Sequence, residues 1–199
     1  MERSNGESMT NELSVLLDMD DVLCDLTGPW MDLLNKRHGT TIKKEDLTVW
    51  HIGRALPIKF PSLTSSEIYA PLDEPGLFRN LPMMPGAKQT LETMKNRGWK
   101  IAIVTSLPVE KHHPGQVVQE KIEWIGEHLS GVVEERDVII THRKDLVRGD
   151  ILVDDAPHNL ETFPGKTIAF DRPWNRNVVV SGRVSHWNQM IEECKTLCR

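Results

Sequence analysis

The chain has 199 residues, 39% of them hydrophobic, and a formal net charge of −5. This length suits one α/β domain with a modest insertion, or at most two small domains, and is enough to bury a core without covalent support. The acidic balance argues against nonspecific binding to nucleic acid or to an anionic membrane surface, and no apolar run approaches the ~20 residues that cross a bilayer.

The amino-terminal residues 1–12 are polar and contain no apolar stretch, so we expect a disordered leader and not a signal peptide or a strand. The chain has three cysteines, too few and too irregularly spaced for a disulfide framework. Reduced thiols, and with them a cytoplasmic protein, are therefore expected.

The first predicted strand covers residues 13–17, a mostly apolar run that ends abruptly in a cluster of acids. Asp18, Asp20 and Asp21 follow at once, where strand ends in open α/β sheets bind ligands. Residues two apart on an extended segment point the same way, so Asp18 and Asp20 should face one site. Repulsion between the two carboxylates is costly there unless a cation or a shared proton offsets it. The more ordinary interpretation is that Asp20 or Asp21 caps the next helix.

The pattern after this acidic turn predicts a helix over residues 29–38 and then a proline-rich segment, 40–80, without strand-like alternation. Short helices and turns fit that segment best, as a small insertion over the site. We expect Phe60, Tyr69 and Phe78 to form a small core within it. Trp50 with His51 is the best candidate there for ligand contact.

The rest of the chain alternates short apolar runs with amphipathic segments. Strands are predicted over residues 99–104, 137–140, 149–153 and 166–170, and helices over residues 87–97, 116–129 and 185–197. Together with the first strand, this pattern predicts a doubly wound parallel sheet of five strands with right-handed crossovers.

Polar residues follow four of these five strands. They are Asp18 and Asp20, Thr105 and Ser106, Lys144, and Asp154 and Asp155. Because the carboxyl ends of parallel strands lie on one edge of the sheet, these sets can meet. Clustered carboxylates with a phosphate suit Mg²⁺. One carboxylate could attack phosphorus, a second could move the proton, and the hydroxyls and the lysine could hold the phosphoryl oxygens. Each motif alone is weak, because hydroxyl caps and solvated lysines are common.

The ordered set resembles the four motifs of the haloacid-dehalogenase-like phosphohydrolases. Over residues 13–197 the chain is similar to the 5′(3′)-deoxyribonucleotidase family. The supporting segments are DMDDVLCDL, Trp50, LPMMPGA, VTSLP and THRKDLVRGDILVDDAP. The resemblance implies a phosphohydrolase core formed by residues 13–26 and 81–199, with residues 27–80 inserted after the first strand as a small helical cap.

The same resemblance implies roles for single residues. Asp18 would be the nucleophile and Asp20 the general acid and base. Mg²⁺ would be held by Asp18, the Asp20 carbonyl and Asp155, with Asp154 behind them, and which of the last two touches the metal is left open. Thr105, Ser106 and Lys144 would bind the phosphoryl group, and Leu26 and Trp50 would face the nucleoside. Asp21 stands where the family has glycine and Leu26 where it has an aromatic residue, which puts a pyrimidine preference in question.

The expected function is therefore a Mg²⁺-dependent phosphatase that acts on (deoxy)nucleoside monophosphates through an aspartyl-phosphate. The alternatives are the same chemistry on another small phosphate ester and a non-catalytic binding module on the same fold. A receiver-like signalling domain is disfavoured, because Asp20 and the insertion serve substrate chemistry. The expected partner is a small phosphate ester, with neither a nucleic-acid polymer nor a membrane, and a homodimer is left open.

Overall fold

Short runs of buried aliphatic residues form one parallel sheet in the computed structural model, which describes residues 12–108 and 113–199. Its strands are β1 (Ser14–Leu17), β2 (Lys100–Thr105), β3 (Val138–Ile140), β4 (Ile151–Asp154), β5 (Lys166–Phe170) and β6 (Gly182–Val184). The strand order is β3-β2-β1-β4-β5-β6. The predicted doubly wound parallel sheet is confirmed, but it has six strands and not five.

The sixth strand is too short to produce a recognisable pattern in the sequence. β6 contains three residues and extends the sheet at its edge by pairing with β5, with Ala169 opposite Arg183. The Arg183 side chain forms an ion pair with Asp171 at 3.2 Å and donates to Asn175 Oδ1 at 2.8 Å. Contacts with the loop that follows β5 therefore fix this segment beside the sheet.

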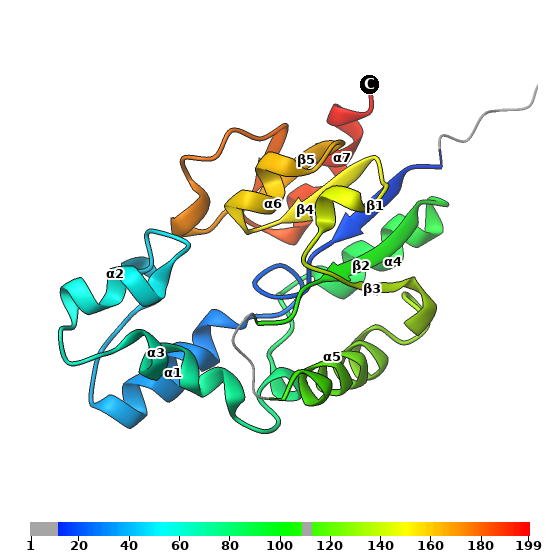
Figure 1. Ribbon diagram of the computed structural model, residues 1–199. Coiled ribbons are helices and arrows are strands. Elements are labelled where there is room, and N and C mark those ends of the chain that lie inside the picture. The colour runs from blue at the N-terminus through cyan, green and yellow to red at the C-terminus, as the bar shows by residue number, and fades with distance from the viewer. Residues whose placement is uncertain (1–11, 109–112) are drawn as a thin grey trace, which may run out of the picture.

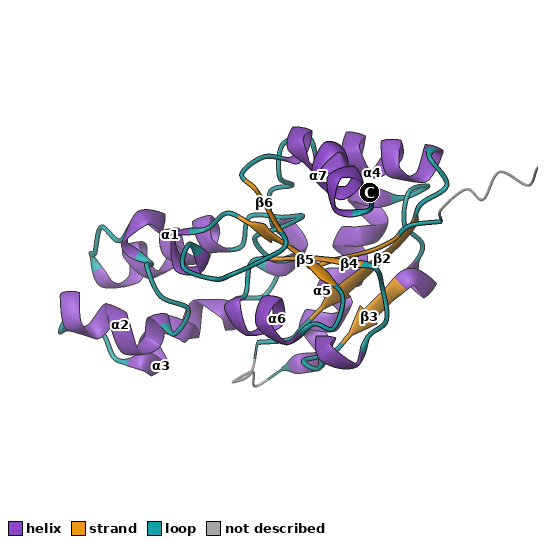
Figure 2. Cartoon of the chain, turned by 90° about the horizontal axis from the view of Figure 1, so that it is seen from above, coloured by secondary structure: helices purple, strands orange, loops and turns teal. Residues whose placement is uncertain are grey.

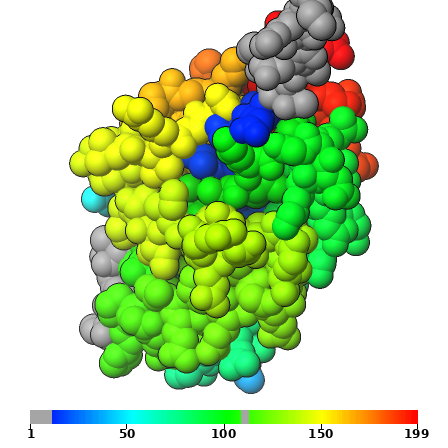
Figure 3. Space-filling model, turned by 90° about the vertical axis from the view of Figure 1, so that its right-hand side faces the viewer, coloured from blue at the N-terminus to red at the C-terminus, as the bar shows by residue number. Residues whose placement is uncertain are grey.

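β1 lies at the centre of the sheet, so the loop that follows it is flanked by loops from both sides. Leu17 at its end is in register with Ile103 of β2 and with Val153 of β4. Figure 3 shows the face of the molecule away from the insertion, where blue atoms from the beginning of the described chain lie between the green and yellow segments. This placement puts the acids after β1 between the ends of β2 and β4.

Helices cover both faces of the sheet, as their apolar spacing requires. The main core includes buried residues of α4 (Ala87–Asn96), α5 (Pro114–Leu129) and α7 (Met190–Leu197), whereas α6 (Pro157–Thr162) lies on the opposite side of the sheet from α4 and α7 (Figure 2). α7 is shorter than the predicted helix over 185–197, because the turn Trp187–Gln189 before it is a 3₁₀ helix.

Three helices of the insertion gather beside the sheet, at one end of the molecule (Figure 1). They are α1 (Thr27–His38), α2 (Ile52–Lys59) and α3 (Ser65–Tyr69). Their buried residues form a second hydrophobic cluster, which also includes Trp174 from the segment after β5, and Phe60 and Tyr69 pack against it. Phe78 lies in the main core instead, so its predicted place in the small core of the insertion is wrong.

The predicted leader, residues 1–12, lies outside the described residues except for Glu12, which pairs with Lys100 at 2.6 Å. Among the helices that the structure describes, none combines the length and the apolar character needed to cross a membrane.

Candidate active site

The main chain turns tightly after β1 and brings Asp18, Asp20 and Asp21 to the carboxyl end of the sheet. The Asp18 amide donates to the Val153 carbonyl at 2.9 Å, so Asp18 is still fixed beside β4. Asp21 has a φ of 56°, and within the described ranges it is the one residue other than glycine with a positive φ. A glycine is the ordinary residue for that conformation, which explains physically why Asp21 is unusual at this position.

A fully buried lysine joins the ends of β1 and β4. Lys144 Nζ donates to Asp18 Oδ1 and, at 2.7 Å, to Asp154 Oδ2, and the lysine side chain is 1% exposed. A buried charge of this kind is tolerated because it is paired with opposite charge. Lys144 thus fixes one oxygen of Asp18 and leaves Asp18 Oδ2 with no hydrogen bond to any of the described residues.

Asp154 and Asp155 have different partners although they are adjacent. Both oxygens of Asp154 are engaged, because Oδ1 accepts from the Ala156 amide at 2.8 Å and Oδ2 accepts from Lys144 and from Asn159 Nδ2. Asp155 Oδ2 accepts from Trp174 Nε1 at 3.0 Å, whereas no hydrogen bond within the described ranges reaches its Oδ1. Asp155 therefore keeps an oxygen that a cation could use.

Three carboxylates meet closely enough to hold one metal ion. Asp18, Asp154 and Asp155 each place an oxygen within 4.8 Å of the others, and all three are buried. Burial raises the pKa of Asp18 to about 7 despite the nearby Lys144 ammonium. Burial and then the charge of Asp154 raise the pKa of Asp155 well above its usual value. A divalent cation would offset this cost, so the donor set fits Mg²⁺.

Asp20 is held by a second buried lysine, Lys121 of α5. Lys121 Nζ donates to Asp20 Oδ2 at 2.6 Å and to Thr105 Oγ1 at 2.7 Å, and the lysine side chain is completely buried. The Asp20 side chain is 21% exposed. Asp20 is therefore the more accessible of the two acids that follow β1 and carry the predicted chemistry.

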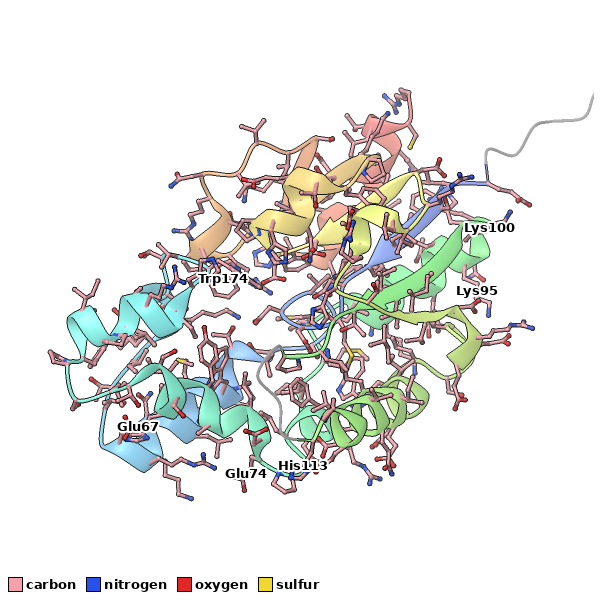
Figure 4. All side chains as sticks on the ribbon, viewed as in Figure 1. Glu67, Glu74, Lys95, Lys100, His113 and Trp174 are labelled. Carbon is pink, nitrogen blue, oxygen red and sulfur yellow. The ribbon has the colours of Figure 1, made fainter. Side chains whose placement is uncertain are left out.

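A cavity of about 440 Å³ opens in front of these acids, between the sheet edge and the insertion. The acids Asp18, Asp20, Asp154 and Asp155 line it from the sheet edge, and the insertion contributes aromatic side chains that include Trp50. The Trp50 ring lies 6.4 Å from that of Trp174, which Figure 4 labels where the insertion and the core come together. The cavity is thus lined both by carboxylates of the sheet edge and by aromatic side chains.

Most of the predicted site residues meet at this cavity. Asp18, Asp20, Leu26, Trp50, Ser106, Asp154 and Asp155 line it. Thr105 and Lys144 do not line it, because both side chains are buried. Lys144 lies behind Asp18, to which it donates, and Thr105 contacts Lys121, which pairs with Asp20. The structure therefore brings the predicted set together but places two predicted phosphate ligands one layer deeper.

Sequence reasoning missed Lys121 and Trp174. Lys121 shares the apolar face of α5 with Val117 and Ile125, four residues before and after it, and all three are buried. A lysine at that spacing in the sequence was a usable signal. Trp174 lies in a 3₁₀ helix, Pro173–Asn175, that follows β5, and nothing in the sequence links it to Asp155.

Comparison with known proteins points to one family. The family described as 5′ nucleotidase, deoxy (pyrimidine), cytosolic type C protein matches residues 11–197. The chain is 33% identical to a 5′(3′)-deoxyribonucleotidase of Bacillus subtilis over 177 residues, covering 88% of this chain and 95% of that protein. A 5′(3′)-deoxyribonucleotidase of Clostridium acetobutylicum is 30% identical over 187 residues, covering 94% and 97%.

Solved structures share the fold at much lower identity. A conserved haloacid dehalogenase-like protein of unknown function from Agrobacterium tumefaciens superposes with a TM-score of 0.65 and 13% identity, over 94% of this chain and 99% of that chain. A hydrolase of the haloacid dehalogenase type from Entamoeba histolytica gives a TM-score of 0.57 and 14% identity, over 94% and 100%. These likenesses establish the fold class that the motifs predicted.

Proposed function

Because this chain belongs to the 5′ nucleotidase, deoxy (pyrimidine), cytosolic type C family, we propose that it is a Mg²⁺-dependent phosphatase acting on (deoxy)nucleoside monophosphates. The observation that carries the proposal is the meeting of Asp18, Asp154 and Asp155 at a cavity that aromatic side chains of the insertion also line. Such a cavity suits a ligand that joins a phosphate to a flat ring.

We propose that Asp18, Asp155 and the Asp20 carbonyl hold the metal, with Asp154 behind them. The hydrogen bonds support this division, since Asp18 and Asp155 each keep an oxygen without a partner among the described residues while both oxygens of Asp154 are engaged. When bound, Mg²⁺ would neutralise charge on the carboxylates and on the phosphoryl oxygens.

Asp18 is the proposed nucleophile. One of its oxygens attacks phosphorus, the bond from phosphorus to the ester oxygen breaks, and an aspartyl-phosphate forms. Lys144 donates to Asp18 and so favours the ionised carboxylate that attack requires, against the effect of burial on its pKa. Ser106, at the cavity wall, and Thr105 and Lys144 behind it are the proposed groups that bind and neutralise the phosphoryl oxygens.

Asp20 is the proposed general acid and base. It gives a proton to the leaving alkoxide and then takes one from the water that hydrolyses the aspartyl-phosphate, which releases phosphate and restores both acids. Its place at the cavity, with a partly exposed side chain, supports this role.

We propose that residues 27–80 act as a cap whose aromatic side chains receive the nucleoside. Trp50 lines the cavity from the cap, and Leu26, the last core residue before the cap, lines it as well. The relatives in Bacillus subtilis and Clostridium acetobutylicum are named deoxyribonucleotidases. The sequence also predicts action in the cytoplasm. Another small phosphate ester is the alternative substrate, because an aromatic wall alone does not select a nucleobase.

The test is phosphate release from deoxy- and ribonucleoside 5′- and 3′-monophosphates and from sugar phosphates, with Mg²⁺ and with a chelator. Mg²⁺-dependent release that favours deoxynucleotides is expected, and Asp18→Asn should abolish it in folded protein. Equal turnover of sugar phosphates would reject the nucleotide preference and keep the chemistry. If folded protein releases no phosphate from any of these substrates, the result would point to a binding role.

A further inference from the structure

Lys121 is a buried cation that no part of the proposed reaction yet uses. Its ammonium donates to Asp20 Oδ2 at 2.6 Å, to Thr105 Oγ1 at 2.7 Å and to the Ser106 carbonyl at 2.9 Å. An ammonium has three N–H donors and no acceptor, so these three contacts satisfy it completely. The side chain is fully buried, and its nitrogen lies 5.3 Å from the centre of the Phe78 ring.

These contacts connect the turn that follows β1 with the carboxyl end of β2. Asp20 belongs to the turn after β1, whereas Thr105 and Ser106 end β2 and lead away from it. Lys121 is fixed on α5, a helix of 16 residues that packs in the main core. Its position is therefore set by a rigid element, and the turn and the strand end are held relative to each other through it.

The contact with Asp20 fixes one carboxylate oxygen and leaves the other for chemistry. Oδ2 accepts from Lys121, while the neighbour of Oδ1 within the described ranges is the Cys24 thiol at 4.0 Å, a weak donor at long range. A carboxylate held at one oxygen loses rotamer freedom, so the other oxygen is presented in one direction.

The contact with Thr105 sets the direction of its hydroxyl hydrogen. Because the ammonium can only donate, Thr105 Oγ1 accepts from it and donates its own hydrogen to the Ser106 carbonyl, in a long hydrogen bond of 3.5 Å. That carbonyl also accepts from Lys121. A negatively charged oxygen would be a stronger acceptor for the hydroxyl hydrogen.

The two buried lysines also separate the two acids. Asp18 is paired with Lys144, and Asp20 is paired with Lys121. Each of the two neighbouring carboxylates therefore has its own lysine to neutralise it. We propose that Lys121 is a positioning residue that holds the reactive oxygen of Asp20, and the hydroxyl of Thr105, in the geometry required for phosphoryl transfer. This inference rests on the proposed function.

The test is a double-mutant cycle in which Lys121→Met is combined with Asp20→Asn. Methionine keeps most of the length of the side chain and removes the ammonium, and water can hydrate the partly exposed Asp20 that remains. We expect a kcat about 10-fold to 100-fold lower for Lys121→Met, with KM within about 3-fold. In the Asp20→Asn background the same change should lower kcat by a clearly smaller factor, because only the positioning of Thr105 is then still lost.

The substrate for the cycle is p-nitrophenyl phosphate, whose weakly basic leaving group keeps the residual turnover of Asp20→Asn measurable. Leu129→Ala is the matched control, since Leu129 is buried on the same helix, as its last residue, eight positions after Lys121. It should lower the melting temperature and leave kcat within about 3-fold. Lys121→Arg keeps the charge and should recover at least about 10-fold of the lost kcat.

Three results would overturn the inference: an unchanged kcat for folded Lys121→Met, a loss of full size in the Asp20→Asn background, or a loss confined to KM. If Lys121→Met does not fold, Lys121→Gln and Lys121→Arg replace it, and equal activity of these two would reject a role for the charge. Wild-type protein inactive with Mg²⁺, or Asp20→Asn as active as wild type, would instead contradict the proposed function, and with it the positioning role of Lys121.

Discussion

Asp154 and Asp155 are adjacent residues whose carboxylates meet different partners. Asp154 compensates the buried charge of Lys144 and also accepts from a main-chain amide and from Asn159. Asp155 accepts one hydrogen bond, from Trp174, and retains an oxygen directed to no described donor. Replacing each acid by its amide should therefore have a different effect on the protein.

Asp155→Asn is expected to fold and to need at least about 10-fold more Mg²⁺ for half-maximal phosphate release, because a charged donor has been removed from the metal site. Asp154→Asn is expected to lower the free energy of unfolding by about 3 kcal/mol, because it breaks the pair with buried Lys144. Mg²⁺ titrations of activity and urea unfolding measure the two effects. Equal Mg²⁺ requirements for both variants would refute the assignment of Asp155.

At the scale of elements, one lysine of the insertion connects it to the loop after β1. Lys44 Nζ lies 2.8 Å from Asp21 Oδ1 and 3.2 Å from Asp25 Oδ1, and 5.9 Å from the centre of the Trp174 ring. Asp21 is almost completely buried, and Thr27 at the start of α1 also donates to it. The ion pairs lie where the chain leaves the core for the insertion, so they should hold the insertion in place over the cavity.

Lys44→Met is expected to lower the free energy of unfolding by about 2 kcal/mol, because it leaves the buried Asp21 carboxylate without its cation. It should also raise KM, since the insertion would be held less firmly over the cavity. Lys59→Met is the control, because Lys59 pairs with Asp46 at the surface of the insertion, and it should cost less than about 1 kcal/mol. Urea unfolding of both variants checks the difference, and equal losses would contradict it.

The starts of β1 and β4 are joined by an exposed carboxylate. Asp150 Oδ2 accepts from the Ser14 amide at 2.8 Å and from its hydroxyl at 2.6 Å, and these hydrogen bonds lower the pKa of Asp150. A carboxyl whose pKa is lower in the folded state stabilises the fold above its unfolded pKa of about 4, and this contribution is lost as the pH falls through the folded pKa.

Asp150→Asn should therefore unfold at a lower urea concentration than wild type at pH 7, because the amide is a weaker acceptor than the carboxylate. The difference between the two proteins should shrink as the pH falls below about 4. Urea unfolding of both proteins over a series of pH values measures it. A difference that stays constant with pH would show that the charge of Asp150 contributes nothing.

At the scale of the whole molecule, the proposed metal site is also a source of instability when no cation is bound. Burial and mutual repulsion raise the pKa values of Asp18 and Asp155, so ionising them in the folded protein is costly. The chain as a whole is acidic, with a net charge of −5, and gives these carboxylates no surplus of positive charge. A cation that binds only the folded state must stabilise it.

Mg²⁺ at about 100 times its dissociation constant should add about 2.7 kcal/mol to the free energy of unfolding, and a chelator should remove this gain. Thermal melting with MgCl₂, and with NaCl at matched ionic strength, measures it. At the same Mg²⁺ concentration the gain should fall to about 1.4 kcal/mol or less in Asp155→Asn, whose site binds at least about 10-fold more weakly. A wild-type protein that gains nothing beyond the NaCl control would contradict a metal site formed by these acids.

The sequence alone determined the elements and the residues at their ends. Runs such as 13–17 and 149–153 predict buried strands from their own composition, and the parallel arrangement follows from the alternation with helices. Since the carboxyl ends of parallel strands share one edge, the order of motifs along the chain is enough to predict that Asp18, Ser106 and Asp155 lie together, and all three line the cavity.

Only the tertiary structure decided what each charged group contacts. Lys121 and Asp20 are 101 residues apart, so nothing local says that a lysine on the apolar face of α5 finds its acceptors there. The different partners of Asp154 and Asp155, the attachment of β6 and the place of Phe78 in the main core have the same origin. Local pattern sets the form of an element, whereas burial of a polar group depends on partners that only the folded chain brings within reach.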